Sequence, residues 1–201
     1  IVFRKLLTKK FFKDNPGREH SVQQFVYSVF LSKGMEKAAG EILEKYGLLD
    51  DDRRETIARE KNMILSEKDP GAIFQLLRKN VDGVNRAVLV DRALEFEDEI
   101  LPMVVGKLVR SGHDTFIDNA VRLLAWSEKD YSPLLFERFE EIRSPYVRSI
   151  VCIILGLRGK EDIIPWMMDR YFEMKRSYPE ETYDEGPLIA LQELDARFYA
   201  D

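Results

Sequence analysis

Four of the eight prolines in this chain recur at an almost constant interval. Steps of 32, 31 and 32 residues separate Pro70, Pro102, Pro133 and Pro165. Proline suits the first turn of a helix, where its missing N–H would have no intrahelical partner. Apolar residues follow at the second, third and sixth positions, which share one helical face. We therefore predict four related helices, each beginning at its proline. The apolar residues are Ala72, Val104, Leu135 and Met167; Ile73, Val105, Phe136 and Met168; and Leu76, Leu108, Phe139 and Tyr171.

A second helix is predicted before each of the last three prolines. The residues 13, 12 and 8 positions before the proline are small or apolar and again share a face. Small side chains let neighbouring helices approach closely. Turn-forming dipeptides separate the two helices at Asp82-Gly83, Ser111-Gly112 and Ser144-Pro145. The repeating unit is therefore a pair of helices. The shared positions are Leu89, Ala120 and Cys152; Val90, Val121 and Ile153; and Leu94, Ala125 and Leu157.

The clearest unit runs from Ser144 to Leu157 and continues from Asp162 to Met168. Its Pro-Tyr-Val-Arg opening, apolar run, Leu-Gly ending and following proline-bearing helix resemble the HEAT repeat, over about residues 53–172. The resemblance implies an all-α fold: a right-handed α-α superhelix, or α-solenoid, of about five antiparallel helix pairs. It also implies that a protein segment binds on the concave surface made by the second helices.

The other units depart from the family pattern. Val84-Asn85 and Ile117-Asp118 stand where the clearest unit has Val147-Arg148. Most of the family's arginine ladder is therefore absent. The repeat indicates a fold and says little about function.

Three segments are predicted. Residues 1–52 form a basic N-terminal segment and capping helices, including a helix pair over residues 20–32 and 35–46 that ends at Gly47. Residues 53–172 hold the HEAT-like repeats. Residues 173–201 form an irregular loop and a C-terminal capping helix, with Leu188, Leu191 and Leu194 on its apolar face.

Composition favours a soluble cytoplasmic protein. Of 201 residues, 45% are hydrophobic and 33% are charged, and no apolar run reaches the length of a membrane span. The single cysteine, Cys152, lies in an apolar run, which predicts a buried thiol rather than a reactive one. A net charge of −5 argues against nucleic acid as the partner, because its binders neutralise phosphates.

The first thirteen residues are distinct in charge. They include Arg4, Lys5, Lys9, Lys10 and Lys13 and no acidic residue. An apolar start followed by basic residues is typical of the cytoplasmic end of a transmembrane helix. An ordinary amphipathic helix with a solvated basic face accounts for the same pattern. A membrane anchor before residue 1 is therefore one of two open interpretations.

No sequence pattern predicts an enzyme, a cofactor or a metal site. His20 and His113 are the only histidines, and neither has a carboxylate or cysteine at ligand spacing. The chain contains no Gly-x-Ser-x-Gly elbow and no glycine-rich phosphate loop. Acidic pairs such as Glu140-Glu141 fall in turns or on predicted exposed faces. We expect a non-catalytic protein without cofactor or metal.

Aligning the helix pairs places five residues on one strip of the second helices. The strip mixes both charge signs around one aromatic side chain, which suits a protein or peptide partner. A solvated helix face explains the same residues equally well. The strip consists of Asp91, Glu95, Arg122, Trp126 and Arg158. We predict a protein-binding scaffold or adaptor that uses this concave strip.

Two other HEAT-like classes are alternatives. HEAT-like alkylpurine DNA glycosylases have a similar length and use tryptophans and an aspartate in a basic concave groove. This chain has Trp126 with Asp118 and Arg122 nearby in sequence, but its acidic balance argues against DNA. The chromophore lyases, which attach a bilin to a partner protein, share only the repeat itself.

Overall fold

Every element in the described part of the chain is a helix. The computed structural model describes residue 41, residues 43–47 and residues 49–199, and no strand occurs among them. The prediction of an all-α fold is confirmed for these residues. None of their helices combines the length and the apolar character needed to cross a bilayer. The elements are α5 (Asp51–Ser66), α6 (Pro70–Leu76), η1 (Gly83–Asn85), α7 (Arg86–Leu94), α8 (Glu97–Leu108), α9 (Asp114–Trp126), α10 (Ser132–Glu137), η2 (Phe139–Glu141), α11 (Pro145–Arg158), η3 (Glu161–Ile163), α12 (Ile164–Ser177) and α13 (Glu185–Phe198).

The chain before α5 lies mostly outside the described residues. The basic residues of segment 1–13 and the helix predicted over 20–32 fall there. Of the helix predicted over 35–46, residues 41 and 43–45 are described and are helical. Gly47 follows with a φ of 62°, a left-handed conformation that glycine adopts without a Cβ penalty. The predicted helix end at Gly47 is therefore confirmed.

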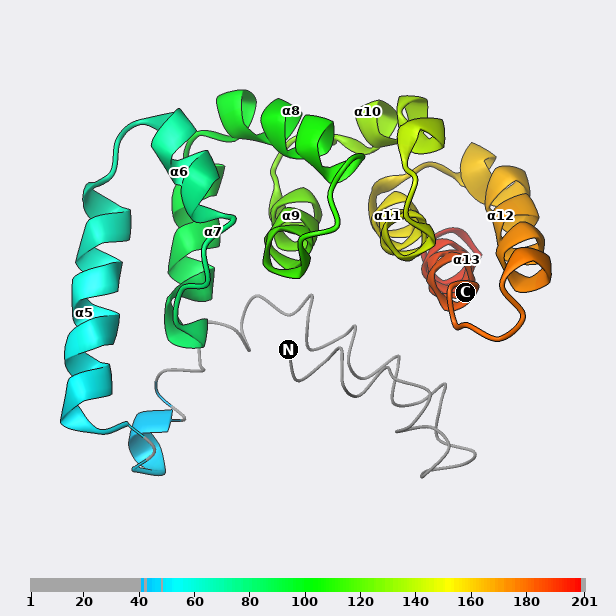
Figure 1. The fold of residues 1–201 in the computed structure, drawn as a ribbon. Helices are drawn as coiled ribbons and strands as arrows, with labels where there is room; N and C mark the ends of the chain where they lie inside the picture. The colour runs from blue at the N-terminus through cyan, green and yellow to red at the C-terminus, as the bar shows by residue number, and fades with distance from the viewer. Residues whose placement is uncertain (1–40, 42, 48, 200–201) are drawn as a thin grey trace.

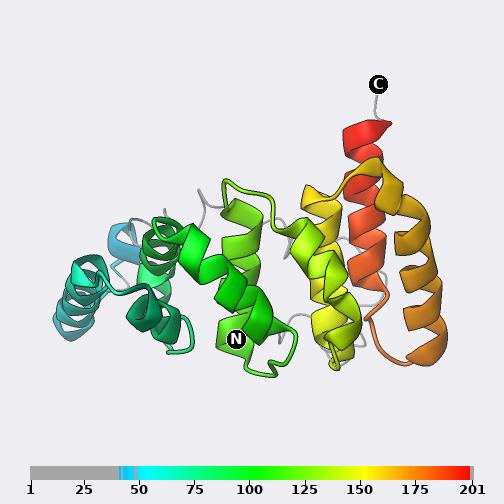
Figure 2. The same cartoon turned by 90° about the horizontal axis from the view of Figure 1, so that it is seen from above.

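The helices are arranged in two rows. In the odd row, α5, α7, α9, α11 and α13 each pack against the next member. In the even row, α6, α8, α10 and α12 pack against α7, α9, α11 and α13 respectively. The odd row from α7 to α13 follows the inner side of an arc and the even row follows its outer side (Figure 1). From above, the helices succeed one another from α5 at one end to α12 and α13 at the other (Figure 2).

Three of the four prolines begin helices as predicted. Pro70 opens α6, and Pro133 and Pro165 lie in the first turns of α10 and α12. Side-chain caps assist at two other helices. Asp50 Oδ1 accepts a hydrogen bond from the Arg53 N–H at 2.8 Å, and Ser144 Oγ accepts one from the Val147 N–H at 3.4 Å. Such caps satisfy N–H groups that the helix leaves unpaired.

Pro102 departs from the prediction because it lies inside α8. That helix begins at Glu97, and its first turn holds Glu97, Asp98 and Glu99. Acidic side chains in a first turn interact favourably with the positive end of the helix dipole, which favours this earlier start. Pro102 therefore leaves the carbonyl of Asp98 without the N–H that a non-proline residue would supply.

Most of the predicted apolar positions lie in the core. The positions 13 and 12 residues before the prolines are all buried. Cys152 is fully buried, which confirms its predicted place in the core. The third position after the proline differs in the last two units, where Phe136 is 44% exposed and Met168 is 42% exposed. These two side chains lie on the even row and not in the core.

Glycine allows α11 and α13 to pack at backbone distance. A Cβ at Gly156 would lie 2.4 Å from the Cα of Ala190, and a Cβ at Gly186 would lie 2.1 Å from the carbonyl oxygen of Ser149. No real Cβ tolerates such distances, so both positions require glycine. The helix predicted near the C-terminus is observed as α13, which packs against α11 and α12. Its buried residues are Gly186, Pro187, Ile189, Ala190 and Leu194, while Leu188 and Leu191 are half-buried.

Candidate partner-binding edge

The C-terminal ends of the odd-row helices meet along one edge of the molecule. At the first junction, Arg92 in the last turn of α7 donates from Nε to the carbonyl oxygen of Glu67 at 3.0 Å. Glu67 is the C-cap residue of α5. The Arg92 guanidinium also pairs with Glu95 and lies 5.0 Å from the centre of the Phe96 ring. The ends of α5 and α7 are therefore tied together by one arginine.

At the next junction, a carboxylate links the ends of α7 and α9 through hydrogen bonds. Glu97, just after α7, accepts hydrogen bonds from the backbone N–H groups of Glu128 and Lys129, just after α9, at 3.0 and 3.1 Å. Asp98 pairs with Lys129 and raises the pKa of that ammonium above its usual value. Burial, with the nearby carboxylates of Glu97 and Asp98, raises the pKa of the Tyr131 hydroxyl, which donates to the carbonyl of Glu97.

Arginines tie the last two junctions. Arg158, the last residue of α11, donates from Nη2 to the carbonyl oxygens of Lys129 at 2.9 Å and Glu128 at 3.3 Å. Arg197, near the end of α13, donates to the carbonyl oxygens of Gly156, Leu157 and Gly159, each at 2.7 Å. These carbonyls belong to the end of α11, which has no further N–H groups of its own to satisfy them. We call this row of linked helix ends the C-terminal edge.

Three residues of the predicted strip lie on this edge. Glu95 caps α7, Trp126 is the last residue of α9, and Arg158 is the last residue of α11. The alignment of repeats had given them equivalent positions, and the links above place them along one edge. Asp91 and Arg122 lie one helical turn further from it.

The strip residues differ in their surroundings. Glu95 is exposed beside Arg92, while Trp126 is half-buried and packs against the core. Asp91 and Arg158 are half-buried. Arg122 departs from the expected exposed position because it is fully buried and donates from Nη1 to the Asp118 carbonyl at 2.9 Å. Two of the five residues, Arg122 and Arg158, therefore make internal contacts to backbone carbonyls.

The sequence patterns missed Arg92, Glu97 and Arg197. Each of these three side chains forms hydrogen bonds with backbone groups. Every residue carries such groups, so the sequence does not show which residue will be the partner. The signal available was their position in the last turn of one helix or the first turn of the next, where unpaired backbone groups gather.

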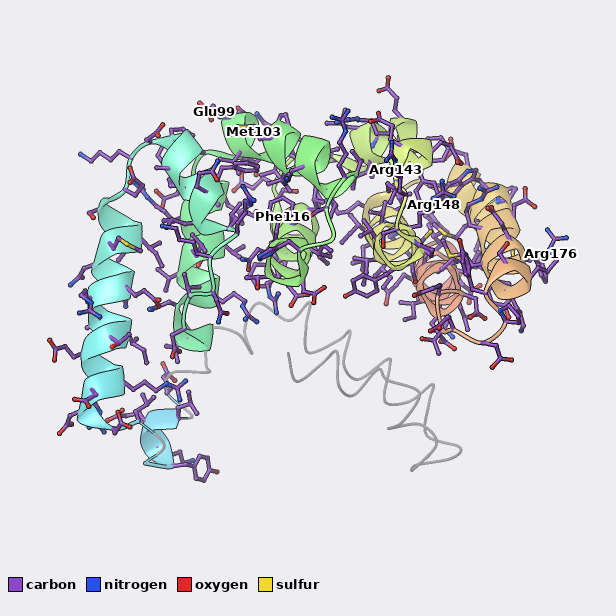
Figure 3. The ribbon with its side chains drawn as sticks, viewed as in Figure 1. Glu99, Met103, Phe116, Arg143, Arg148 and Arg176 are labelled. Carbon is purple, nitrogen blue, oxygen red and sulfur yellow. The ribbon has the colours of Figure 1, made fainter. Side chains whose placement is uncertain are left out.

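The even row presents apolar side chains to the outside. Met103 and Glu99 project from the outer side of α8, and Arg176 projects from α12 (Figure 3). Phe136 on α10 packs edge-on against Trp166, with ring centres 5.1 Å apart, and remains exposed. The exposed apolar residues of this row are Met103, Phe136, Met168 and Phe172.

The described residues contain no group of three or more His, Cys, Asp or Glu side chains arranged to hold a metal ion. Burial raises the pKa of the Cys152 thiol well above its usual value. A thiol in that environment stays protonated and is a poor nucleophile.

Comparisons with known proteins return no relative for this chain: no family model, no curated protein and no solved structure matches it. Its function is therefore inferred from its own geometry.

Proposed function

We propose that this chain is a right-handed HEAT-like α-solenoid of about five helix pairs. The period of the prolines supports this interpretation, as does the buried pattern that recurs with it. The arrangement of the helices in two rows, with contacts between each helix and the next member of its row, is the packing expected of stacked helix pairs.

We propose further that the protein is a non-catalytic scaffold that binds a segment of another protein along the C-terminal edge, on the concave side. The observation that carries the proposal is the alignment of Glu95, Trp126 and Arg158 on that edge. Tryptophan and arginine are the residue types that most often dominate protein interfaces. The links between helix ends hold these side chains at fixed spacing, which lowers the entropy lost on binding.

The surroundings of the edge favour a protein partner over DNA. Glu95, Asp98, Glu128 and Asp130 are exposed at the ends of α7 and α9, and their charges would repel phosphates. Arg122 is buried and bonded to the Asp118 carbonyl, so it is poorly placed to contact a DNA backbone. The glycosylase alternative therefore has less support than the scaffold.

Cytoplasmic location stays a prediction, supported by a single cysteine buried in the core. The membrane anchor rests on the basic residues of segment 1–13, outside the described residues, and also stays a prediction.

Site-specific photo-crosslinking tests the scaffold directly. A photoreactive phenylalanine analogue replaces Glu95 on the C-terminal edge or, as a control, Glu137 at the end of α10 in the even row. Both residues are exposed glutamates at helix ends. After irradiation in cells, we expect one discrete protein adduct from position 95 and none from position 137. The absence of an adduct at position 95, or equal adducts at both positions, would contradict the proposal.

A further inference from the structure

The two ends of the array differ in how much side chain they bury. Over its 16 residues, α5 has one buried residue, Ile64. Over its 14 residues, α11 has nine, from Val147 to Gly156. Burial of apolar surface supplies most of the free energy that keeps a helix folded in a protein. The end that contains α5 is therefore held much less strongly than the end that contains α11.

Exposed apolar residues on α5 show the same weakness. Met63 and Leu65, on either side of Ile64, are 45% and 48% exposed. The next helix, α6, has only seven residues, of which Ile73 and Leu76 are buried. Helices this short are not stable without tertiary packing. α6 has such packing, because the Phe74 ring meets the Phe116 ring of α9 edge-on, with ring centres 5.9 Å apart. Little apolar contact therefore holds α5 alone against the rest of the row.

Polar contacts join α5 to α7. Arg53 pairs with Asp82 at 3.0 Å, and Asn85 Nδ2 donates to the Ile57 carbonyl at 2.9 Å. Arg92 bonds to the Glu67 carbonyl at the other end of α5. The side chain of Arg53 is 41% exposed, and ion pairs partly open to water contribute little to stability.

The opposite end is locked by backbone packing. Gly156 and Gly186 let α11 and α13 touch at distances that admit no Cβ. Arg197 then satisfies three carbonyls at the end of α11. Opening this end would uncover much of the buried face of α11, which holds nine buried residues, and would break those charged hydrogen bonds.

We infer that α5 forms a separate opening unit, which detaches from α7 while α6 to α13 stay folded. Proteins commonly open in such units, with the least buried element opening first. Detachment uncovers the side of α7 that packs against α5. Among the described helices, α5 is thus a movable element, independently of what binds the C-terminal edge.

Native-state hydrogen exchange of the full chain, read by mass spectrometry, tests this inference. In the wild-type protein, amides of α5 should exchange much faster than amides of α11 and α13. The opening that lets the α5 amides exchange should expose little surface. The change Ile64→Ala should raise the exchange rates of α5 by about 30-fold, because it removes the only buried side chain of α5. Rates in α11 and α13 should change less than about twofold, since α5 opens without them.

Leu65→Ala is the matched control because Leu65 is adjacent, exposed and of the same size. It should leave every rate near the wild-type value. Two results would overturn the inference. One is exchange of α5 amides as slow as that of α11 amides in the wild type. The other is an equal acceleration of α5 and α11 by Ile64→Ala, which would show a single cooperative unit.

Discussion

The close approach of α11 to α13 depends on the absence of a carbon atom at Gly156. At Gly156 a Cβ would lie 2.4 Å from the backbone of Ala190, so α11 and α13 must separate if any side chain is added. We expect Gly156→Ala to lower the free energy of unfolding by about 1–3 kcal/mol, although alanine is the better helix former. Urea unfolding followed by circular dichroism measures the change.

Gly83→Ala is the control for that experiment. No atom lies within 4 Å of a Cβ built at Gly83, and its φ is not positive. Its substitution should leave stability unchanged or raise it by up to about 1 kcal/mol. A Gly156→Ala protein as stable as wild type would mean that the two helices are not in backbone contact.

Single residues were predictable where their environment follows from periodicity. Cys152 belongs to an apolar face, and its burial follows from that face alone. Arg122 shares a predicted surface strip with Trp126, yet it is fully buried. Periodicity assigns a residue to one side of a helix but does not say what packs on that side. The burial of an arginine depends on those neighbours and on the carbonyl it reaches.

At the scale of elements, the proline inside α8 gives a direct test of the observed helix start. Pro102 is exposed and removes one backbone hydrogen bond from the helix interior. We expect Pro102→Ala to stabilise the protein by about 1–3 kcal/mol, because alanine restores the bond to the Asp98 carbonyl. Thermal and urea unfolding of the purified variant provide the measurement. A loss of stability would indicate that α8 begins at residue 102, as the proline period predicts.

The link between α5 and η1 should respond to acid. Burial disfavours the charged form of Asp82, but hydrogen bonds from Arg53 and the Val84 N–H outweigh it and leave the pKa of Asp82 below its usual value. A carboxyl group with a lowered pKa stabilises the fold above its unfolded-state pKa, about 3.9, and loses that contribution as pH falls further.

Asp82→Asn isolates this contribution. The variant should lose at most about 1 kcal/mol at neutral pH, since the ion pair with Arg53 is gone while the asparagine still caps η1. Its difference from wild type should stay constant from about pH 7 to pH 5 and shrink below about pH 4. Urea unfolding across this range gives the two curves. Parallel curves down to the acid limit would show that Asp82 is not preferentially ionised in the folded protein.

Element boundaries followed the sequence where a cap or a first-turn proline marks them, as at Pro70 and Ser144. The prediction was wrong at Pro102 because the acidic residues Glu97 to Glu99 start the helix earlier. Prolines that recur at a regular interval in the sequence need not occupy the same position in their helices. The charge of the first turn decided the boundary in this unit.

Over the whole molecule, the register of the repeats was enough to place Glu95, Trp126 and Arg158 on one strip. When helices stack side by side, residues at equivalent positions of successive repeats lie in one line across them. The links made by Arg92, Glu97 and Arg197 were beyond the reach of the sequence because their partners are backbone groups. These links hold the edge in shape, so the proposed binding surface depends on residues that no pattern identified.

Charge reversal on the two rows tests the central proposal most directly, using the partner captured at position 95. Glu95→Lys changes an exposed residue at the end of α7, and Glu137→Lys makes the same change at the end of α10. Glu95→Lys also removes the ion pair with Arg92, which is partly open to water and contributes at most about 1 kcal/mol. A lysine at a helix C-terminus is compatible with the helix dipole, so both variants should stay folded. Isothermal titration calorimetry with that partner should show binding weakened at least tenfold, about 1.4 kcal/mol, by Glu95→Lys and unchanged by Glu137→Lys. Wild-type affinity in Glu95→Lys, or equal loss in both variants, would contradict a partner bound along the C-terminal edge.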